Sequence, residues 1–112
     1  MHNTALLISN DGLGHGDEAL RHMLAAKYFA TLLEGNFHPR VLLFYGAGVK
    51  LACDGSPCLD SLQGLVEAKV EIVVCRSCLE HYELIDATDS RWRGTMLQIL
   101  EWQQLVDKVI TL

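Results

Sequence analysis

Four short runs along the chain are apolar at almost every position. None of them alternates between apolar and polar residues, which indicates strands that are covered on both faces, as in a parallel sheet. Successive runs begin roughly 30 to 40 residues apart, the span of a strand, a helix and the return to the sheet. The predicted strands are residues 5–8, 41–45, 70–74 and 109–112.

Two of the intervening segments carry clear helix signals. Apolar residues recur on one face of residues 17–34, and Asp17 suits the positive N-terminal end of such a helix. Thr95 and Gln98 have the spacing of a capping box, in which each residue satisfies a backbone group of the other. This spacing predicts a last helix over residues 96–108.

Two further helix starts are predicted from local capping signals. Ser56 followed by Pro57 is typical of an N-cap and the first helical position. Ser77 and Glu80 again have capping-box spacing, which predicts a short helix directly after the third strand. Cys78 would then be the first residue of that helix.

The order of these elements predicts the α/β class. We expect a three-layer α/β/α sandwich with a mainly parallel sheet of four to five strands. The fifth strand would be a short extended piece within residues 87–92. Residues 1–112 read as a single domain, because no linker, repeat or low-complexity tract interrupts the pattern.

The composition and the charge of the chain argue against two classes of binding partner, nucleic acids and membranes. Half of the 112 residues are hydrophobic and 21% are charged, which is enough apolar material for a folded core. The net charge of −5 and the absence of a Lys/Arg cluster argue against nucleic-acid binding. The apolar runs are far shorter than the roughly 20 residues that cross a bilayer, and no export signal follows Met1. We therefore expect a cytoplasmic protein with reduced thiols and no membrane association.

Three loops with unusual residues are expected at one edge of the sheet. Residues 10–16, 46–55 and 75–78 each follow a predicted strand, and parallel strands bring their carboxyl ends together. Open α/β sheets bind ligands in the crevice beyond those ends. This edge is therefore the predicted site.

The sequence Cys75-Arg76-Ser77-Cys78 is the sharpest chemical feature of that edge. The thiolate is the reactive form of cysteine, and a helix N-terminus and a nearby guanidinium both favour it. Cys75 would end the third strand and point into the crevice, and the two thiols could close a small disulfide. The alternative is that both are small buried hydrophobic side chains.

Two other interpretations of the cysteines have to be weighed. A thioredoxin-like motif would follow an early strand, whereas this one follows the third. A zinc site would use four thiolates, from Cys53, Cys58, Cys75 and Cys78. The second pair has the usual two-residue gap and the first pair has four, so zinc remains an alternative but not the preferred one.

The glycine-rich loop after the first strand is less specific. Gly12, Gly14 and Gly16 resemble a phosphate cradle, but neighbouring acidic residues would repel an anion, and a tight turn explains them equally well. His15 in that loop is either an acid-base group or a solvated side chain. Lys50 is a candidate cation for the crevice or an ordinary surface lysine.

Three stretches of the chain resemble the DsrE-like sulfur-transfer family, closest to the C-terminal domain of the YedF group linked to selenium metabolism. They are LLISNDGLGHGDEAL from residue 6, GVKLACDGSPCLDSL from residue 48 and VEIVVCRSCLEHY from residue 70. The resemblance implies a parallel α/β/α sandwich that assembles as trimers or hexamers. It also implies a persulfide carried on the cysteine after the third strand, by position Cys75, with Cys78 as the second cysteine of the pattern.

The expected positions of Cys75 in the crevice and Cys78 at the helix end suggest a mechanism, and the resemblance implies a partner. A thiolate of Cys75 would take sulfur from a donor persulfide, supported by Arg76 and Ser77, and Cys78 would resolve the product. YedF proteins have a TusA-like domain before this one, so the expected donor is a separate TusA-like protein. No cofactor or metal is implied, and whether the chain is a carrier or a sulfurtransferase is left open. The rival function is an oligomeric small-ligand-binding module without thiol chemistry.

Two features depart from the family pattern. Cys53 and Cys58 are not part of it, so the resemblance assigns them no role. Glu83 stands where the family has glycine after the tyrosine of the short helix.

Overall fold

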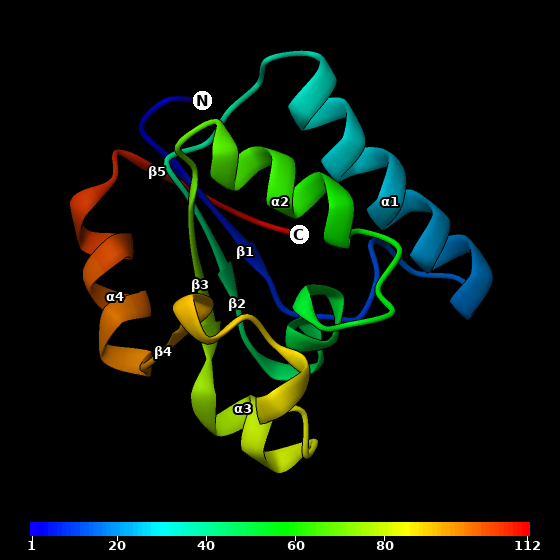
Figure 1. The fold of residues 1–112 in the computed structure, drawn as a ribbon. Coiled ribbons are helices and arrows are strands. Elements are labelled where there is room, and N and C mark those ends of the chain that lie inside the picture. Colours follow the sequence, from blue (N-terminus) through cyan, green and yellow to red (C-terminus); the bar gives the residue numbers. More distant parts are fainter.

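The computed structural model describes all 112 residues and contains one five-stranded sheet in the order β4-β3-β2-β1-β5 (Figure 1). Every neighbouring pair of strands is parallel. The four apolar runs are strands, within one residue of the predicted bounds. The strands are β1 (Thr4–Ile8), β2 (Val41–Phe44), β3 (Glu71–Cys75), β4 (Arg93–Gly94) and β5 (Lys108–Thr111).

The fifth strand lies just beyond its predicted place. Residues 87–92 lie mostly in two short 3-10 turns, η2 (Ile85–Ala87) and η3 (Ser90–Trp92), and only then does the chain extend into β4. The cause is local, because the Asp89 carboxylate accepts the backbone N–H of Arg91 and fixes a turn there. The sheet nevertheless has the five parallel strands of the predicted sandwich.

The direction of the crossovers sets the three layers. The chain steps from β1 to β2 to β3 in one direction, so right-handed connections put α1 (Glu18–Glu34) and α2 (Leu59–Glu67) on the same face. The connection from β4 to β5 runs back across the sheet, which puts α4 (Met96–Leu105) on the opposite face (Figure 1). The predicted α/β/α arrangement is therefore confirmed.

Two of the predicted helix starts are confirmed. The Asp17 carboxylate accepts the backbone N–H of Leu20 at 2.9 Å and caps α1. Thr95 and Gln98 form the full capping box that begins α4. The last helix ends at Leu105 and not at residue 108, because Val106 is already extended and buried.

The other two predicted starts are each wrong by two residues. Ser56 does not cap α2, because its hydroxyl accepts the N–H of Cys58 in a preceding turn and the helix begins at Leu59. Ser77 does not cap α3 (Arg76–His81), whose N-cap is Cys75. Cys78 is therefore the third residue of α3 and not the first.

The core is continuous from one helical layer to the other. It contains 27 buried hydrophobic residues, and β1 and β2 are buried along their whole length. Each fully buried leucine, isoleucine or phenylalanine contributes about 1.5–3 kcal/mol, so these two strands hold the sheet firmly beneath its carboxyl edge. None of the helices has the length and apolar character needed to cross a bilayer.

Candidate functional site

A 3-10 segment that the sequence pattern did not predict covers the carboxyl edge of the sheet. Residues 46–55 were expected to be a loop, but η1 (Gly46–Ala52) forms a compact turn there. It follows Tyr45, whose backbone N–H donates to the Ile8 carbonyl at 3.1 Å at the end of β1. Gly46 begins the turn with φ of +58°, which a glycine adopts without strain. In Figure 1, η1 and α3 lie together below the ends of β2 and β3.

Cys78 is the accessible thiol of the site. It is half-buried on α3, and its Sγ accepts the backbone N–H of Gly46 at 3.2 Å. Burial is the main cause that raises the pKa of Cys78, the adjoining Cys75 thiol raises it further, and the Gly46 N–H partly offsets both. At neutral pH this sulfur is therefore held mostly as the thiol.

Cys75 is buried, which corrects the expectation that it opens into a crevice. Only 2% of its surface is exposed. It ends β3 beside Gly94, its pairing partner in the added strand β4, and it also forms the N-cap of α3. The two thiols of the motif thus lie one behind the other, with Cys78 outermost.

The side chains of the two residues between the cysteines form no hydrogen bond with either thiol. The Arg76 Nε donates to the Glu80 carboxylate at 3.1 Å, and both side chains are largely exposed. Ser77 is exposed and makes no hydrogen bond with its hydroxyl. The expected support of a thiolate by Arg76 therefore has no contact behind it, whereas the N–H of Gly46, which the sequence analysis did not single out, makes one.

Lys50 lies in η1 at the same edge, and it contacts the C-terminal end of α3. Its Nζ is 4.4 Å from the centre of the Tyr82 ring, a cation-π contact that joins η1 to the residue after α3. The amine is exposed and forms no ion pair. Glu83, the next residue, has φ of +58°, which explains why glycine suits this position in the resembled family.

The glycine-rich loop folds back on α1 and does not form a phosphate cradle. Gly12 is buried so closely that a Cβ there would lie 2.6 Å from the Cβ of Arg21. The Arg21 guanidinium pairs with Asp11, and the Asp17 carboxylate already occupies the N-terminus of α1. The loop is thus a structural turn, in agreement with the simpler of the two interpretations.

The remaining members of this loop stay apart from the thiols. Gly14, His15 and Gly16 are exposed, and His15 makes no hydrogen bond or ion pair. Of the predicted site residues, the structure therefore brings together Cys75 and Cys78. Lys50 lies at the same edge against Tyr82, and His15 and the three glycines of the loop lie apart from the thiols.

Cys53 and Cys58 are separate from the site. Cys53 is buried, with its Sγ 3.2 Å from both the Val49 carbonyl and the Thr88 hydroxyl. Cys58 is fully buried at the start of α2. No group of three or more His, Cys, Asp or Glu side chains converges anywhere in the chain, so the four cysteines do not form the zinc site weighed above.

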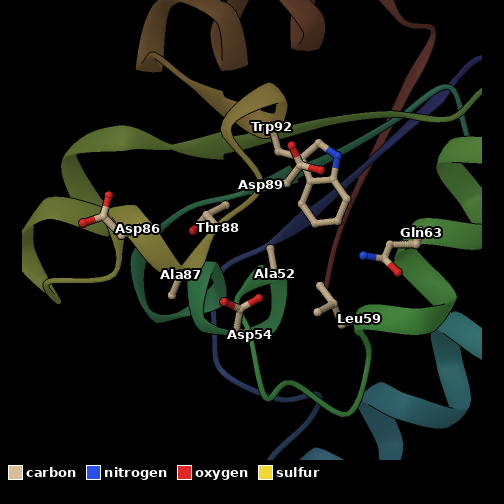
Figure 2. Close-up of a pocket in the computed structure, with 9 residues that line it drawn as sticks. All are labelled: Ala52, Asp54, Leu59, Gln63, Asp86, Ala87, Thr88, Asp89 and Trp92. Carbon is tan, nitrogen blue, oxygen red and sulfur yellow. The ribbon is translucent and has the colours of Figure 1, made fainter.

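A hollow of about 260 Å³ lies beside η2 and η3, away from the thiols (Figure 2). Trp92 and the amide of Gln63 face it, and Asp54, Asp86 and Asp89 surround it. No cysteine lines it. Three carboxylates, of which only Asp89 is paired with an arginine, would repel an anion, so this hollow gives no support to an anion-binding module.

Comparison with known proteins identifies the relatives of the chain. A family model described as the DsrE/DsrF-like family matches residues 3–112. The crystal structure of the ychN protein from E. coli matches with 22% identity and a TM-score of 0.64, over 100% of both chains. A conserved protein of unknown function, BT1422 from Bacteroides thetaiotaomicron, matches with 13% identity and a TM-score of 0.66, over 98% of this chain and 95% of that one. These two structures share the fold. No curated protein matches the chain.

Proposed function

Because this chain belongs to the DsrE/DsrF-like family, we propose that it carries sulfur as a persulfide on the pair Cys75 and Cys78. The observation that supports this most is Cys78, which is partly exposed at the carboxyl edge and whose Sγ accepts a backbone N–H from 3.2 Å. A partner protein can reach this sulfur, and it cannot reach Cys75 without opening the fold. We therefore assign the entry of sulfur to Cys78 and not, as the family position alone suggested, to Cys75.

The transfer is a thiol exchange on sulfur. Cys78 attacks the outer sulfur of a donor persulfide, a new S–S bond forms on Cys78, and the old S–S bond breaks to release the donor as its thiol. The proton of the Cys78 thiol leaves with the donor. A persulfide is a stronger acid than its parent thiol, so the product is the form that ionises, and the Gly46 N–H is placed to stabilise the anion.

The neighbouring thiol supplies a way to discharge the carrier. Cys75 lies close enough to Cys78 to perturb its pKa. Attack of the Cys75 sulfur on the inner sulfur of the persulfide forms a Cys75–Cys78 disulfide and releases hydrosulfide. Two electrons from an external dithiol then restore both thiols. In the alternative outcome, an acceptor thiol removes the outer sulfur and leaves both cysteines reduced.

The donor that fits this scheme is a second protein with an exposed persulfide, and a TusA-like protein is the class we propose. The exposed side of α3 beside Cys78 is the surface such a donor has to reach. The proposed activity is thus that of a sulfur carrier or a sulfurtransferase-like protein without a bound cofactor.

Mass spectrometry after incubation with glutathione persulfide tests the assignment. The wild type and Cys75→Ser are expected to gain one sulfur atom, mapped to the peptide that carries Cys78. Cys75→Ser should keep that sulfur longer, because the discharging thiol is gone. Cys53→Ser is the matched control and should behave as the wild type. A wild type without added sulfur, or Cys78→Ser loaded on Cys75, would contradict the proposal.

A further inference from the structure

The hollow beside η2 and η3, which we call the Trp92 hollow, is preformed. Its walls come from the turn after η1, from α2 and from η2 and η3 (Figure 2). The backbone N–H of Asp54 donates to the Ala87 carbonyl at 2.9 Å, and Cys53 pairs with Thr88 in an isolated β-bridge. These bonds join two walls of the hollow, so a ligand does not have to order them on binding.

The Trp92 hollow has an excess of negative charge. Asp54 and Asp86 are exposed and form no ion pair. Asp89 is paired with Arg91 at 2.6 Å. No lysine, arginine or histidine lines the hollow. The two unpaired carboxylates therefore favour a cationic ligand.

Trp92 adds a second, independent feature to the hollow. Only 5% of this residue is exposed, and a buried indole N–H ordinarily finds a hydrogen-bond partner. The indole N–H of Trp92 has no partner within the chain, and it is not sealed in the core as the unpartnered Nε2 of His38 and Nε of Arg93 are. The Gln63 amide faces the same hollow (Figure 2). A donor left open in this way indicates a ligand that supplies an acceptor oxygen.

The carboxylates of the hollow favour a guanidinium over a metal ion. They do not converge, because no group of three or more His, Cys, Asp or Glu side chains is placed to hold a metal. A cation that contacts both Asp54 and Asp86 therefore has to present donors in several directions. A guanidinium has five N–H donors in a rigid plane, whereas an ammonium is a compact point charge. The volume of about 260 Å³ suits one such group and the short chain that carries it.

A second hollow continues the site beyond Trp92. Its volume is about 220 Å³, and it shares Gln63 and Trp92 with the first hollow. Glu67 and Arg91 also line it. The chain that carries the guanidinium can therefore extend along Trp92 and place an oxygen against the indole N–H.

We propose that the Trp92 hollow binds an arginine, with its guanidinium between Asp54 and Asp86 and its carboxyl or carbonyl oxygen accepting the indole N–H of Trp92. The arginine is either the free amino acid or a residue in a segment of another protein, since both contain these two groups. The site uses neither Cys75 nor Cys78, so it does not depend on the sulfur transfer proposed above.

Titration followed by nuclear magnetic resonance of the indole N–H groups tests the proposal. The chain has only two tryptophans, and Trp102 lies on α4, so each spectrum contains one signal from the hollow and one internal control. The signal that remains in Trp102→Phe is that of Trp92. The probes are free L-arginine and the tripeptide acetyl-Gly-Arg-Gly-amide. We expect a saturable shift of the Trp92 signal with an unmoved Trp102 signal, and the probe that binds more tightly identifies the source of the arginine.

Matched ligands and variants test the charge. The same probes with citrulline in place of arginine keep the shape without the charge, and they should bind about tenfold more weakly because two charge pairs are lost. Asp54→Asn and Asp86→Asn should each weaken binding about three- to fivefold, as expected of partly exposed pairs. Asp60→Asn, at an exposed position of α2 outside the hollow, should bind as the wild type does. Circular dichroism checks that each variant is folded.

Three results overturn the proposal. The first is a Trp92 signal that neither probe shifts. The second is a citrulline probe, or a probe with lysine in place of arginine, that binds as tightly as the arginine probe. The third is unchanged affinity in both Asp54→Asn and Asp86→Asn.

Discussion

The molecule contains two pairs of cysteines at the same edge of the sheet, and their surroundings differ. Cys53 and Cys58 are both buried, and the Cys53 sulfur is held by the Val49 carbonyl and the Thr88 hydroxyl. Cys78 is only partly buried and accepts a hydrogen bond from a backbone N–H. A thiol that contacts a carbonyl is held as a hydrogen-bond donor, whereas a sulfur that accepts an N–H can bear negative charge.

The lesson is that proximity to the carboxyl edge does not by itself make a cysteine functional. Burial raises the pKa of Cys53, Cys58 and Cys78 alike. What separates Cys78 is its access to solvent and the donor that η1 presents to it. Cys75 is intermediate between the two cases, because it is as buried as the first pair but adjoins Cys78.

The largest expected difference between the pairs is in alkylation. With iodoacetamide at about pH 8, where part of a thiol population is ionised, Cys78 should react at least about 100-fold faster than the other three cysteines. A buried thiol reacts only when its segment opens, and an opening cost of about 3 kcal/mol already gives that factor. Peptide mapping against time measures all four rates in one sample. Equal alkylation rates for Cys58 and Cys78 would show that the buried pair and Cys78 do not differ in accessibility.

The second expected effect is on stability. Cys58→Ser puts a hydroxyl where the sulfur is fully buried at the start of α2, and we expect a loss of about 1–3 kcal/mol in the free energy of unfolding. Cys53→Ser should lose less than about 1 kcal/mol, because Val49 and Thr88 can still bond the hydroxyl. Urea denaturation measures both, with Cys78→Ser as a control within about 0.5 kcal/mol of the wild type. The reverse order for Cys53 and Cys58 would show that their contacts do not decide the cost.

Much of this arrangement is predictable from the sequence, and the limits have physical causes. Strands β1, β2 and β3 are predictable because burial on both faces requires a run of apolar residues. The run at residues 109–112 was expected to be covered in the same way, but β5 is an edge strand of which only Ile110 is partly buried. The capping boxes at Ser77 and Thr95 have the same spacing, but only the second forms. At Ser77 the position of β3 overrides the local capping signal, because α3 starts directly at the end of that strand and Ser77 is already inside the helix.

The exposure of each thiol was not predictable from local pattern. The motif does place Cys75 and Cys78 at the correct edge, but η1, which lies over that edge, and β4, which pairs with the end of β3, are distant in sequence. The one signal available for η1 was the pair Gly46 and Gly48, since glycines two apart suit a turn that the chain enters with positive φ. His15 was predicted as a site residue only because it lies in the glycine-rich loop, and that loop packs on α1 and not beside the thiols.

The third prediction distinguishes the effect of backbone strain on stability from the effect of the Gly46 N–H on the reactivity of Cys78. Gly46→Ala and Gly55→Ala both place a side chain at positive φ, with φ of +58° and +86°, and should each cost about 1–2 kcal/mol of stability. Gly46→Ala should cost somewhat more than Gly55→Ala, because its Cβ would lie 3.2 Å from the Ser9 carbonyl oxygen. Only Gly46 donates to Cys78, so only Gly46→Ala should change the alkylation rate of Cys78, by about threefold or more. Parallel urea curves and alkylation rates give the comparison. Equal changes of rate in the two variants would mean that the N–H contact does not tune the sulfur.

The smallest expected effect is the pH dependence of stability that the buried pair creates. Burial raises the pKa of Cys53 and Cys58, so the folded state binds their protons more tightly than the unfolded chain does. This stabilisation is fully present below the unfolded thiol pKa of about 8.5 and is lost as the pH rises through the folded pKa. Urea midpoints measured from about pH 7 to about pH 9.5, below the ordinary range of tyrosine, should therefore fall for the wild type. They should fall less steeply for the double variant Cys53→Ser with Cys58→Ser, in which Cys75 and Cys78 are the only cysteines left. Identical slopes in the two proteins would show that the buried thiols do not ionise differently in the folded and unfolded states, and the contrast between the two pairs would then be one of access alone.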